Sequence, residues 1–193
     1  MLHMIVAYDA KTRGIGFENK LPWHIPADLK HFKDTTKYNN ILMGSNTFFS
    51  IGKVLPFRHH IVLTRDIDAF KAKAAERNID IGEVEILLME DEQVVNQTRL
   101  QELIDSEYPN YIIGGAKVYD MFLPYTHTII ASEIELPDDH GLQFDRFFPV
   151  LSPGRWISTG MERVGADPYS FLIHKQTSLD YYEQETNNKI NWY

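Results

Sequence analysis

The chain has 193 residues, a length that fits one domain. Its net charge of −8 argues against general nucleic-acid binding, which needs a basic surface, and its lack of cysteine excludes disulfides and thiolate metal sites. The N-terminal residues lack the basic start of a signal peptide, and no apolar run is long enough to span a membrane, so we expect a cytoplasmic protein.

Strands and helices are predicted to alternate through the first two thirds of the chain. Short apolar runs without a helical period predict strands, and proline followed by an acidic residue predicts a helix start near residue 25. In chain order we expect strands at 4–8, 40–43, 60–63, 84–89 and 111–113, a loop at 10–25, and helices at 25–37, 47–51, 69–77, 100–107 and 116–123. This alternation is typical of an α/β fold with a mainly parallel sheet.

The last third of the chain is predicted to contain strands alone. They fall at 128–132, 156–161 and 169–174, and we expect them to lie antiparallel at one edge of the sheet. The residues that follow are polar and aromatic, which favours a loosely ordered end. We therefore expect one domain over residues 1–177 and a C-terminal tail over residues 178–193.

An acidic residue shares a helix face with an aromatic one in the first predicted helix. Asp28, Phe32 and Thr36 follow one another at intervals of four residues, so they lie on the same face. Asp28 either stabilises the helix N-terminus through the helix dipole or points into a pocket and binds a polar heterocycle. The spacing alone favours the first explanation.

Small or basic residues follow three of the predicted strands. Gly44 and the pair Gly114–Gly115 each stand between a strand and a helix, where backbone N–H groups can bind a phosphate. Arg65 ends another strand, at the edge where ligands of α/β sheets bind. Ser45 or Asn46 could equally be a simple helix cap, and Arg65 a surface residue. Together the three segments suit a pyrophosphate with one additional phosphate.

These motifs together resemble the dihydrofolate reductase family. The similarity covers most of residues 4–174 and is carried by segments within 15–32, 43–52, 55–58 and 113–119. It implies a single-domain α/β fold with an eight-stranded, mainly parallel sheet, an antiparallel C-terminal strand and four flanking helices. It also implies an enzyme that uses NADPH to reduce 7,8-dihydrofolate to 5,6,7,8-tetrahydrofolate, by hydride transfer to the protonated C6–N5 imine. Nothing in the sequence requires more than a monomer, and its eight histidines show no metal-ligand spacing, so we expect no metal.

The resemblance assigns roles around the substrate. Asp28 corresponds to the carboxylate that binds the pterin, with Trp23 and Ser132 in the water and hydroxyl network beside it. Arg58 corresponds to the bidentate partner of the substrate's α-carboxylate, a task that suits its planar guanidinium. The other substrate-binding residues implied are Ile5, Val6, Phe32, Ser50, Ile51, Leu55 and Ile113.

The resemblance also assigns the NADPH site. Ala7 and Ile15 are expected to bind the nicotinamide carboxamide through backbone groups, Leu21 to sit in a mobile loop that closes over the site, and the Gly114–Gly115 peptide to be cis. Asp28, Trp23, Leu21, Tyr119 and Ser132 are the catalytic residues implied. The cofactor-binding residues implied are Ala7, Ile15, Gly16, Gly44, Ser45, Asn46, Thr47, Leu63, Thr64, Arg65, Ile113, Gly114, Gly115, Ala116, Lys117, Val118 and Tyr119.

Two departures from the family pattern affect these expectations. Many members carry a basic residue where this chain has Ser45, so one phosphate contact is missing or replaced, and we expect Arg65 to carry most of the preference for the 2′-phosphate. The stretch at 66–110 is longer and more acidic than in compact members. Because the whole chain is acidic, its basic residues must gather at the site, and the candidates are Lys33, Lys53, Arg58, Arg65 and Lys117.

Two alternative functions remain open at this point. One is a reductase of the same fold that acts on a pyrimidine in riboflavin synthesis, and the other is a folate- or nucleotide-binding module without catalytic activity. The pyrimidine reductase is disfavoured by the residues on the pterin side, which are Trp23, Asp28, Phe32 and Arg58. Asp28 and the intact glycine motifs disfavour a module that has lost catalysis.

Overall fold

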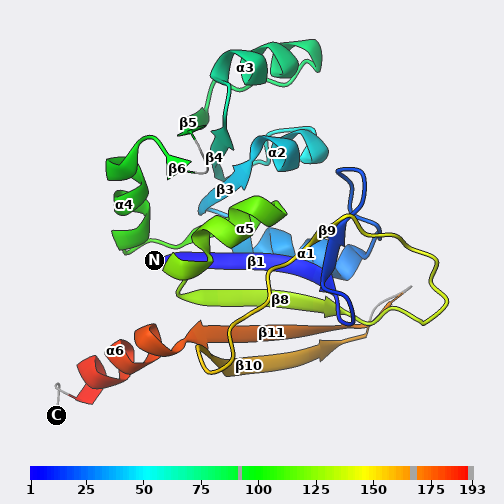
Figure 1. Cartoon of the computed structure of the whole chain (residues 1–193), viewed down its shortest axis with the longest axis vertical. Helices are drawn as coiled ribbons and strands as arrows, with labels where there is room; N and C mark the ends of the chain where they lie inside the picture. The colour runs from blue at the N-terminus through cyan, green and yellow to red at the C-terminus, as the bar shows by residue number, and fades with distance from the viewer. Residues whose placement is uncertain (91–92, 166–168, 191–193) are drawn as a thin grey trace.

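One large sheet organises the chain (Figure 1). The structure is a computed structural model, which describes residues 1–90, 93–165 and 169–190. The sheet has nine strands in the order β10-β11-β8-β1-β7-β3-β4-β5-β6. In chain order these are β1 (Leu2–Asp9), β3 (Asn40–Gly44), β4 (His59–Thr64), β5 (Val84–Glu90), β6 (Gln93–Val94), β7 (Asn110–Gly114), β8 (Thr128–Ile134), β10 (Trp156–Val164) and β11 (Phe171–Ser178).

The parallel centre and antiparallel edge that the sequence predicts are confirmed. The pairs from β8 through β1, β7, β3 and β4 to β5 are all parallel, whereas β11 runs antiparallel to both β8 and β10. The two-residue β6 adds a ninth strand to the expected eight. Two further short strands, β2 (Gly14–Gly16) and β9 (Arg146–Phe147), pair separately with each other and were not predicted.

Helices connect the parallel strands, as the alternating pattern predicts. They are α1 (Pro26–Thr36), α2 (Ser45–Ile51), α3 (Ile67–Glu76), α4 (Gln97–Asp105), α5 (Ala116–Phe122), the 3₁₀ helix η1 (Leu123–Tyr125) and α6 (Leu179–Ile190). The described residues thus form six α-helices where four were expected. None of these helices has the length and apolar character needed to cross a membrane.

Both faces of the parallel strands are buried, which explains their unbroken apolar runs. Alternate residues of one strand contribute to opposite cores, because successive strand side chains point to opposite faces. Leu42 packs in the core with Leu2, Met4 and other β1 residues, while its neighbours Ile41 and Met43 pack with Phe48 and Phe70. The sheet therefore separates two apolar layers and leaves its strand ends free to form a site.

The C-terminal segment is a helix, so the expectation of a loose tail is wrong for residues 179–190. The Tyr181 hydroxyl donates to the Met1 sulfur at 2.9 Å, and its ring packs edge-on against His127 at 4.8 Å. The backbone of Leu179 also bonds to Arg155. These partners are brought together only by the sheet, so the composition of the tail gave no sign of them. Residues 191–193 lie outside the described part of the chain.

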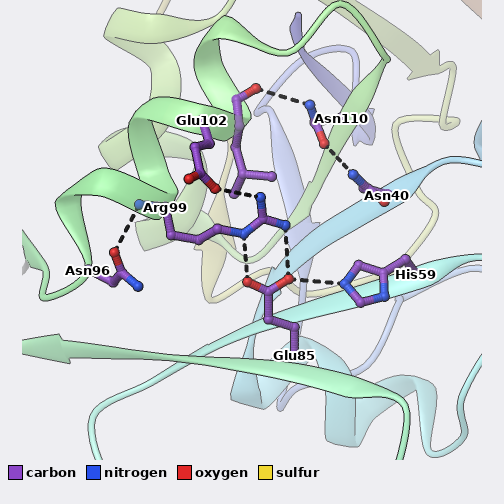
Figure 2. A network of polar contacts seen from close by, with 8 residues as sticks. Asn40, His59, Glu85, Asn96, Arg99, Glu102 and Asn110 are labelled. Carbon is purple, nitrogen blue, oxygen red and sulfur yellow. Dashed lines mark hydrogen bonds and ion pairs between the residues drawn. The ribbon is translucent and has the colours of Figure 1, made fainter.

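Polar side chains tie the starts of β4 and β5 to α4 (Figure 2). The Arg99 guanidinium donates two hydrogen bonds to the Glu85 carboxylate, at 2.8 and 3.0 Å. His59 lies 3.0 Å from the same carboxylate. Hydrogen bonds from Arg99 hold the pKa of Glu85 below its usual value. The network secures α4 at the end of the sheet opposite the strand termini that form the site described below.

Asn110, at the start of β7, joins three segments in the same region (Figure 2). Its buried side chain accepts a hydrogen bond from Asn40 at 2.7 Å and donates to the carbonyls of Leu103 and Tyr108 at 3.0 and 3.1 Å. Asn110→Ala leaves these groups unpaired, so we expect the free energy of unfolding in urea to fall by about 2–3 kcal/mol. The control is Gln101→Ala, which removes an exposed contact and should change stability by less than about 0.5 kcal/mol. Equal losses in the two variants would contradict this role.

Candidate functional site

A large cavity opens where the parallel strands end. Its volume is about 1160 Å³, and it is lined by residues at the carboxyl ends of β1, β3, β4, β5 and β7 and by residues of α1, α2 and α5. This edge is where open α/β sheets bind their ligands. Every residue that the sequence singled out as catalytic, substrate-binding or cofactor-binding lines this cavity.

The charged residues that line the cavity are mainly basic, although the whole chain is acidic. Asp28 is the one carboxylate among its described lining residues, although the chain carries a net charge of −8. The basic lining residues are Lys20, Lys33, Lys53, Arg58, Arg65, Lys117 and Arg146. All five basic residues expected at the site are among them. A cavity with this charge balance attracts anionic ligands.

Asp28 lies in the first turn of α1, yet its side chain is only 7% exposed and faces the cavity. The structure therefore favours a pocket carboxylate over a residue that only complements the helix dipole. Burial raises the pKa of Asp28, while a hydrogen bond from the Ser132 hydroxyl and the nearby His31 oppose the rise. Ser132 reaches this position because β8 pairs with β1, which sets Ser132 beside Ala7.

Two aromatic residues stand beside the carboxylate in the cavity wall. Trp23 is buried, and its indole Nε1 has no hydrogen-bond partner among the described residues. Tyr119 is also buried, and its hydroxyl donates to the Ile5 carbonyl at 2.8 Å. Burial, together with the charge of Asp28, raises the pKa of Tyr119. Tyr119 is thus a neutral residue of the cavity wall, whereas the Nε1–H group of Trp23 remains free to donate a hydrogen bond.

The two glycine turns lie next to each other at this edge of the sheet. The register of β3 and β7 pairs Met43 with Gly114, and the Gly114–Gly115 peptide is cis, as expected. A Cβ atom at Gly115 would lie 3.3 Å from the Thr47 hydroxyl, and one at Gly44 would lie 3.2 Å from Val118. The close packing of the two turns therefore depends on residues without side chains.

The start of α2 carries no side-chain cap. Gly44 is the N-cap residue and makes no such bond, so the alternative that Ser45 or Asn46 serves as a plain cap is wrong. Backbone N–H groups in a first helical turn lack partners within the helix. The residues of this turn, Ser45, Asn46 and Thr47, line the cavity.

Two arginines line the cavity in different states. Arg58 is fixed by hydrogen bonds to the Thr36 hydroxyl at 2.8 Å and to the carbonyls of Pro56 and Lys33 at 2.9 and 3.0 Å. Partial burial lowers the pKa of Arg58, and it has no carboxylate partner in the described part of the chain. Arg65, at the end of β4, is exposed and makes no hydrogen bond or ion pair with any described residue. Both side chains are therefore available to an anion.

Several lining residues were missed by the sequence reasoning. Met89 lies near the carboxyl end of β5, so the same rule that found Arg65 would have found it. Arg146 reaches the cavity because β9 pairs with β2, more than 120 positions earlier in the chain, and no local signal predicts that pairing. The other lining residues that were not expected are Asn19, Lys20, His24, Ile25, Leu29 and Pro56.

Known proteins share this sequence and fold. The family model for dihydrofolate reductase matches residues 1–179. Dihydrofolate reductase of Staphylococcus haemolyticus is 35% identical over 176 residues, covering 90% of this chain and 93% of the relative. Dihydrofolate reductase of Bacillus subtilis (strain 168) is 30% identical over 184 residues, covering 91% and 95%. The structure of dihydrofolate reductase from Enterococcus faecalis complexed with NADP(H) and RAB-propyl is similar with a TM-score of 0.75 and 27% identity, covering 93% of this chain and 97% of that one.

Asp28→Asn is expected to stabilise the ligand-free protein at neutral pH. Because the pKa of Asp28 is raised, the folded state binds more protons than the unfolded state between the usual pKa of 3.8 and the raised one, so stability falls as pH rises through that window. Above the window, the neutral amide should raise the free energy of unfolding by about 1–3 kcal/mol, or about 2–4 °C in Tm per kcal/mol. Thermal unfolding between pH 3 and pH 8 measures this gain, which should shrink as the pH falls; a gain independent of pH would contradict it.

Proposed function

The chain belongs to the dihydrofolate reductase family, and from that premise we propose which residues carry out its reaction, the NADPH-dependent reduction of 7,8-dihydrofolate to 5,6,7,8-tetrahydrofolate. The observation that carries the proposal is one buried carboxylate, Asp28, in a cavity that also contains the Gly114–Gly115 turn. The remaining walls are apolar or basic, which suits a flat heterocycle and two anionic ligands.

The cavity residues fit NADPH by their chemistry. The glycine turns let backbone N–H groups approach a pyrophosphate closely, and no carboxylate other than Asp28 stands among the described lining residues to repel it. Ala7 and Ile15 offer backbone groups to the carboxamide, while Ile113 and Tyr119 form the walls around the nicotinamide. When bound, NADPH supplies the hydride. The chain contributes by holding the two reacting rings together, which lowers the entropic part of the barrier.

Arg65 is the residue that we assign to the 2′-phosphate of NADPH. Its guanidinium is exposed, lines the cavity and has no competing partner among the described residues. Ser45 offers only a hydroxyl and backbone N–H where many family members have a basic side chain. Selectivity for NADPH over NADH therefore rests mainly on Arg65.

Asp28 binds the amidine edge of the pterin and favours its protonated form. A carboxylate with a raised pKa, in a mostly apolar wall, gains much from a cationic hydrogen-bond partner. Because Asp28 binds the opposite side of the ring from N5, it acts on N5 electrostatically and the proton arrives through water. The unused Nε1 donor of Trp23 and the Ser132 hydroxyl are suited to hold such a water and orient the carboxylate.

The other end of the cavity binds the tail of the substrate. Phe32, Ile51 and Leu55 supply apolar walls for the aminobenzoyl ring, with Ile5, Val6, Ser50 and Ile113 as further contacts. Arg58 binds the α-carboxylate. Its three hydrogen bonds to neighbouring oxygens fix the guanidinium before the substrate arrives, so little side-chain entropy is lost on binding. Leu21, which is 51% exposed at the mouth, belongs to the loop that closes as a lid.

The cellular setting is part of the same proposal. We propose a cytoplasmic monomer whose ligands are dihydrofolate and NADPH and which binds no nucleic acid. The net charge of −8 supports the last point, because the basic residues that line the cavity leave an acidic remainder.

The test of the proposal is Asp28→Asn, assayed by NADPH oxidation with dihydrofolate. We expect activity at pH 7 to fall by about 10²–10⁴-fold, because the pterin loses its electrostatic support for protonation. The loss should narrow at low pH, where solvent protonates the substrate. A variant with nearly normal activity at neutral pH would refute the role of Asp28, and an unmodified chain without activity would refute the function.

Arg58→Leu and Arg65→Leu are reciprocal controls for the two anion sites. A charge-assisted hydrogen bond contributes about 1.5–3 kcal/mol, so each substitution should raise the KM of the ligand that the arginine binds by about 10–100-fold. Arg58→Leu should raise KM for dihydrofolate but not for a pterin without the glutamate tail. Arg65→Leu should raise KM for NADPH but not for NADH. Equal effects on both members of either pair would reject that assignment.

A further inference from the structure

Gly14, on β2, is in contact with the ring of Phe144. A Cβ atom added at Gly14 would lie 2.2, 2.3 and 2.8 Å from three atoms of the Phe144 side chain, closer than real Cβ atoms come to other atoms. The φ angle of Gly14 is not in the left-handed region, so its backbone is open to any residue. The atoms nearest to a Cβ atom at this position therefore all belong to Phe144.

Phe144 also packs behind the indole of Trp23. The two ring centroids are 6.0 Å apart with an interplanar angle of 57°, and both residues belong to the apolar cluster around Ile25 and Leu136. Trp23 lines the cavity, whereas Phe144 does not. His140 supports the far side of Phe144, with ring centroids 6.1 Å apart. Phe144, in the loop that follows β8, thus packs against both Trp23 and His140.

The backbone fixes Phe144 in this position. Pairing of β2 with β9 brings the long connection after β8 beside the segment that follows β1, as Figure 1 shows. The Asp145 N–H, next to Phe144, donates to the Gly16 carbonyl at 3.0 Å, and the Phe148 N–H donates to the Arg13 carbonyl at 2.9 Å. The ring therefore enters the space beside Gly14 from a residue just before β9, the strand that pairs with β2.

We propose that Phe144 is a positioning residue for the reaction, which holds Trp23 against the cavity beside Asp28 by occupying the space that the absent side chain of Gly14 provides. The inference rests on the proposed function, because Trp23 is there assigned to the water that serves the pterin. It adds that the position of Trp23 is set by a residue 121 positions later in the chain and outside the cavity.

The first test follows Trp23 directly, in the full chain with Trp156→Phe and Trp192→Phe, which leaves Trp23 as the one tryptophan. Gly14→Ala and Phe144→Ala are each expected to shift the Trp23 emission to the red and raise its quenching by acrylamide. Gly14→Ala should have little further effect in a chain that already carries Phe144→Gly, because this change removes all three atoms that a Cβ atom at Gly14 would meet. Additive effects of the two substitutions would overturn the proposed fit between Gly14 and Phe144.

The second test separates positioning from general stability. Phe144→Ala should lower kcat at pH 7 by about tenfold, since small misplacements of this kind are costly to catalysis, and leave the Kd for NADPH unchanged. The loss should shrink at low pH, where the pterin no longer depends on the water beside Trp23. A loss that is the same at all pH values, or one confined to the Kd for NADPH, would overturn the positioning role.

The matched control is Phe147→Ala. Phe147 is an exposed aromatic on β9 that is not among the described lining residues of the cavity or the ring contacts of Trp23, and its replacement should change neither the fluorescence nor kcat. The tests also distinguish failure of the proposed function from failure of the positioning role of Phe144. Failure of the proposed function would appear as an inactive unmodified chain, whereas failure of this inference would appear as a normal Trp23 signal in an active Phe144→Ala variant.

Discussion

The burial of one carboxylate in a largely apolar wall is the constraint on which the rest of the site depends. The Ser132 hydroxyl donates a hydrogen bond to Asp28, but burial still raises the pKa of this carboxylate, so a cationic ring bound beside it would stabilise its charged form. The fold tolerates this cost because the surrounding sheet is buried on both faces and rigid. The buried carboxylate therefore favours binding of the protonated form of the pterin.

Charge is divided between the cavity and the outer surface. An acidic chain that binds two anionic ligands must keep its carboxylates away from the site, and among the described lining residues only Asp28 remains. The cations come from separate elements: Lys33 from α1, Arg58 from the turn before β4, and Arg65 from its end. Their convergence depends on strand order, because parallel strands end at the same edge.

Glycine has three different functions around the site. At Gly114 the φ angle of +116° requires it, at Gly115 the Thr47 hydroxyl leaves little room for a Cβ atom, and at Gly14 the ring of Phe144 occupies the space. Only the first is a backbone requirement. The other two are contacts with partners remote in sequence, so they couple the loops around the cavity to each other.

Local periodicity and turn chemistry predict the alternating strands and helices from β3 to β8, the parallel centre of the sheet, and the functional segments that contain Asp28, Gly44, Arg65 and Gly114. The burial of Asp28, the approach of Arg146 and Phe144 to the site region, and the helix at residues 179–190 could not be predicted in this way. Each of those facts depends on pairing between segments far apart in the chain, such as β2 with β9. The local sequence does not identify such distant partners, because the free energy that favours their pairing arises only when the sheet assembles.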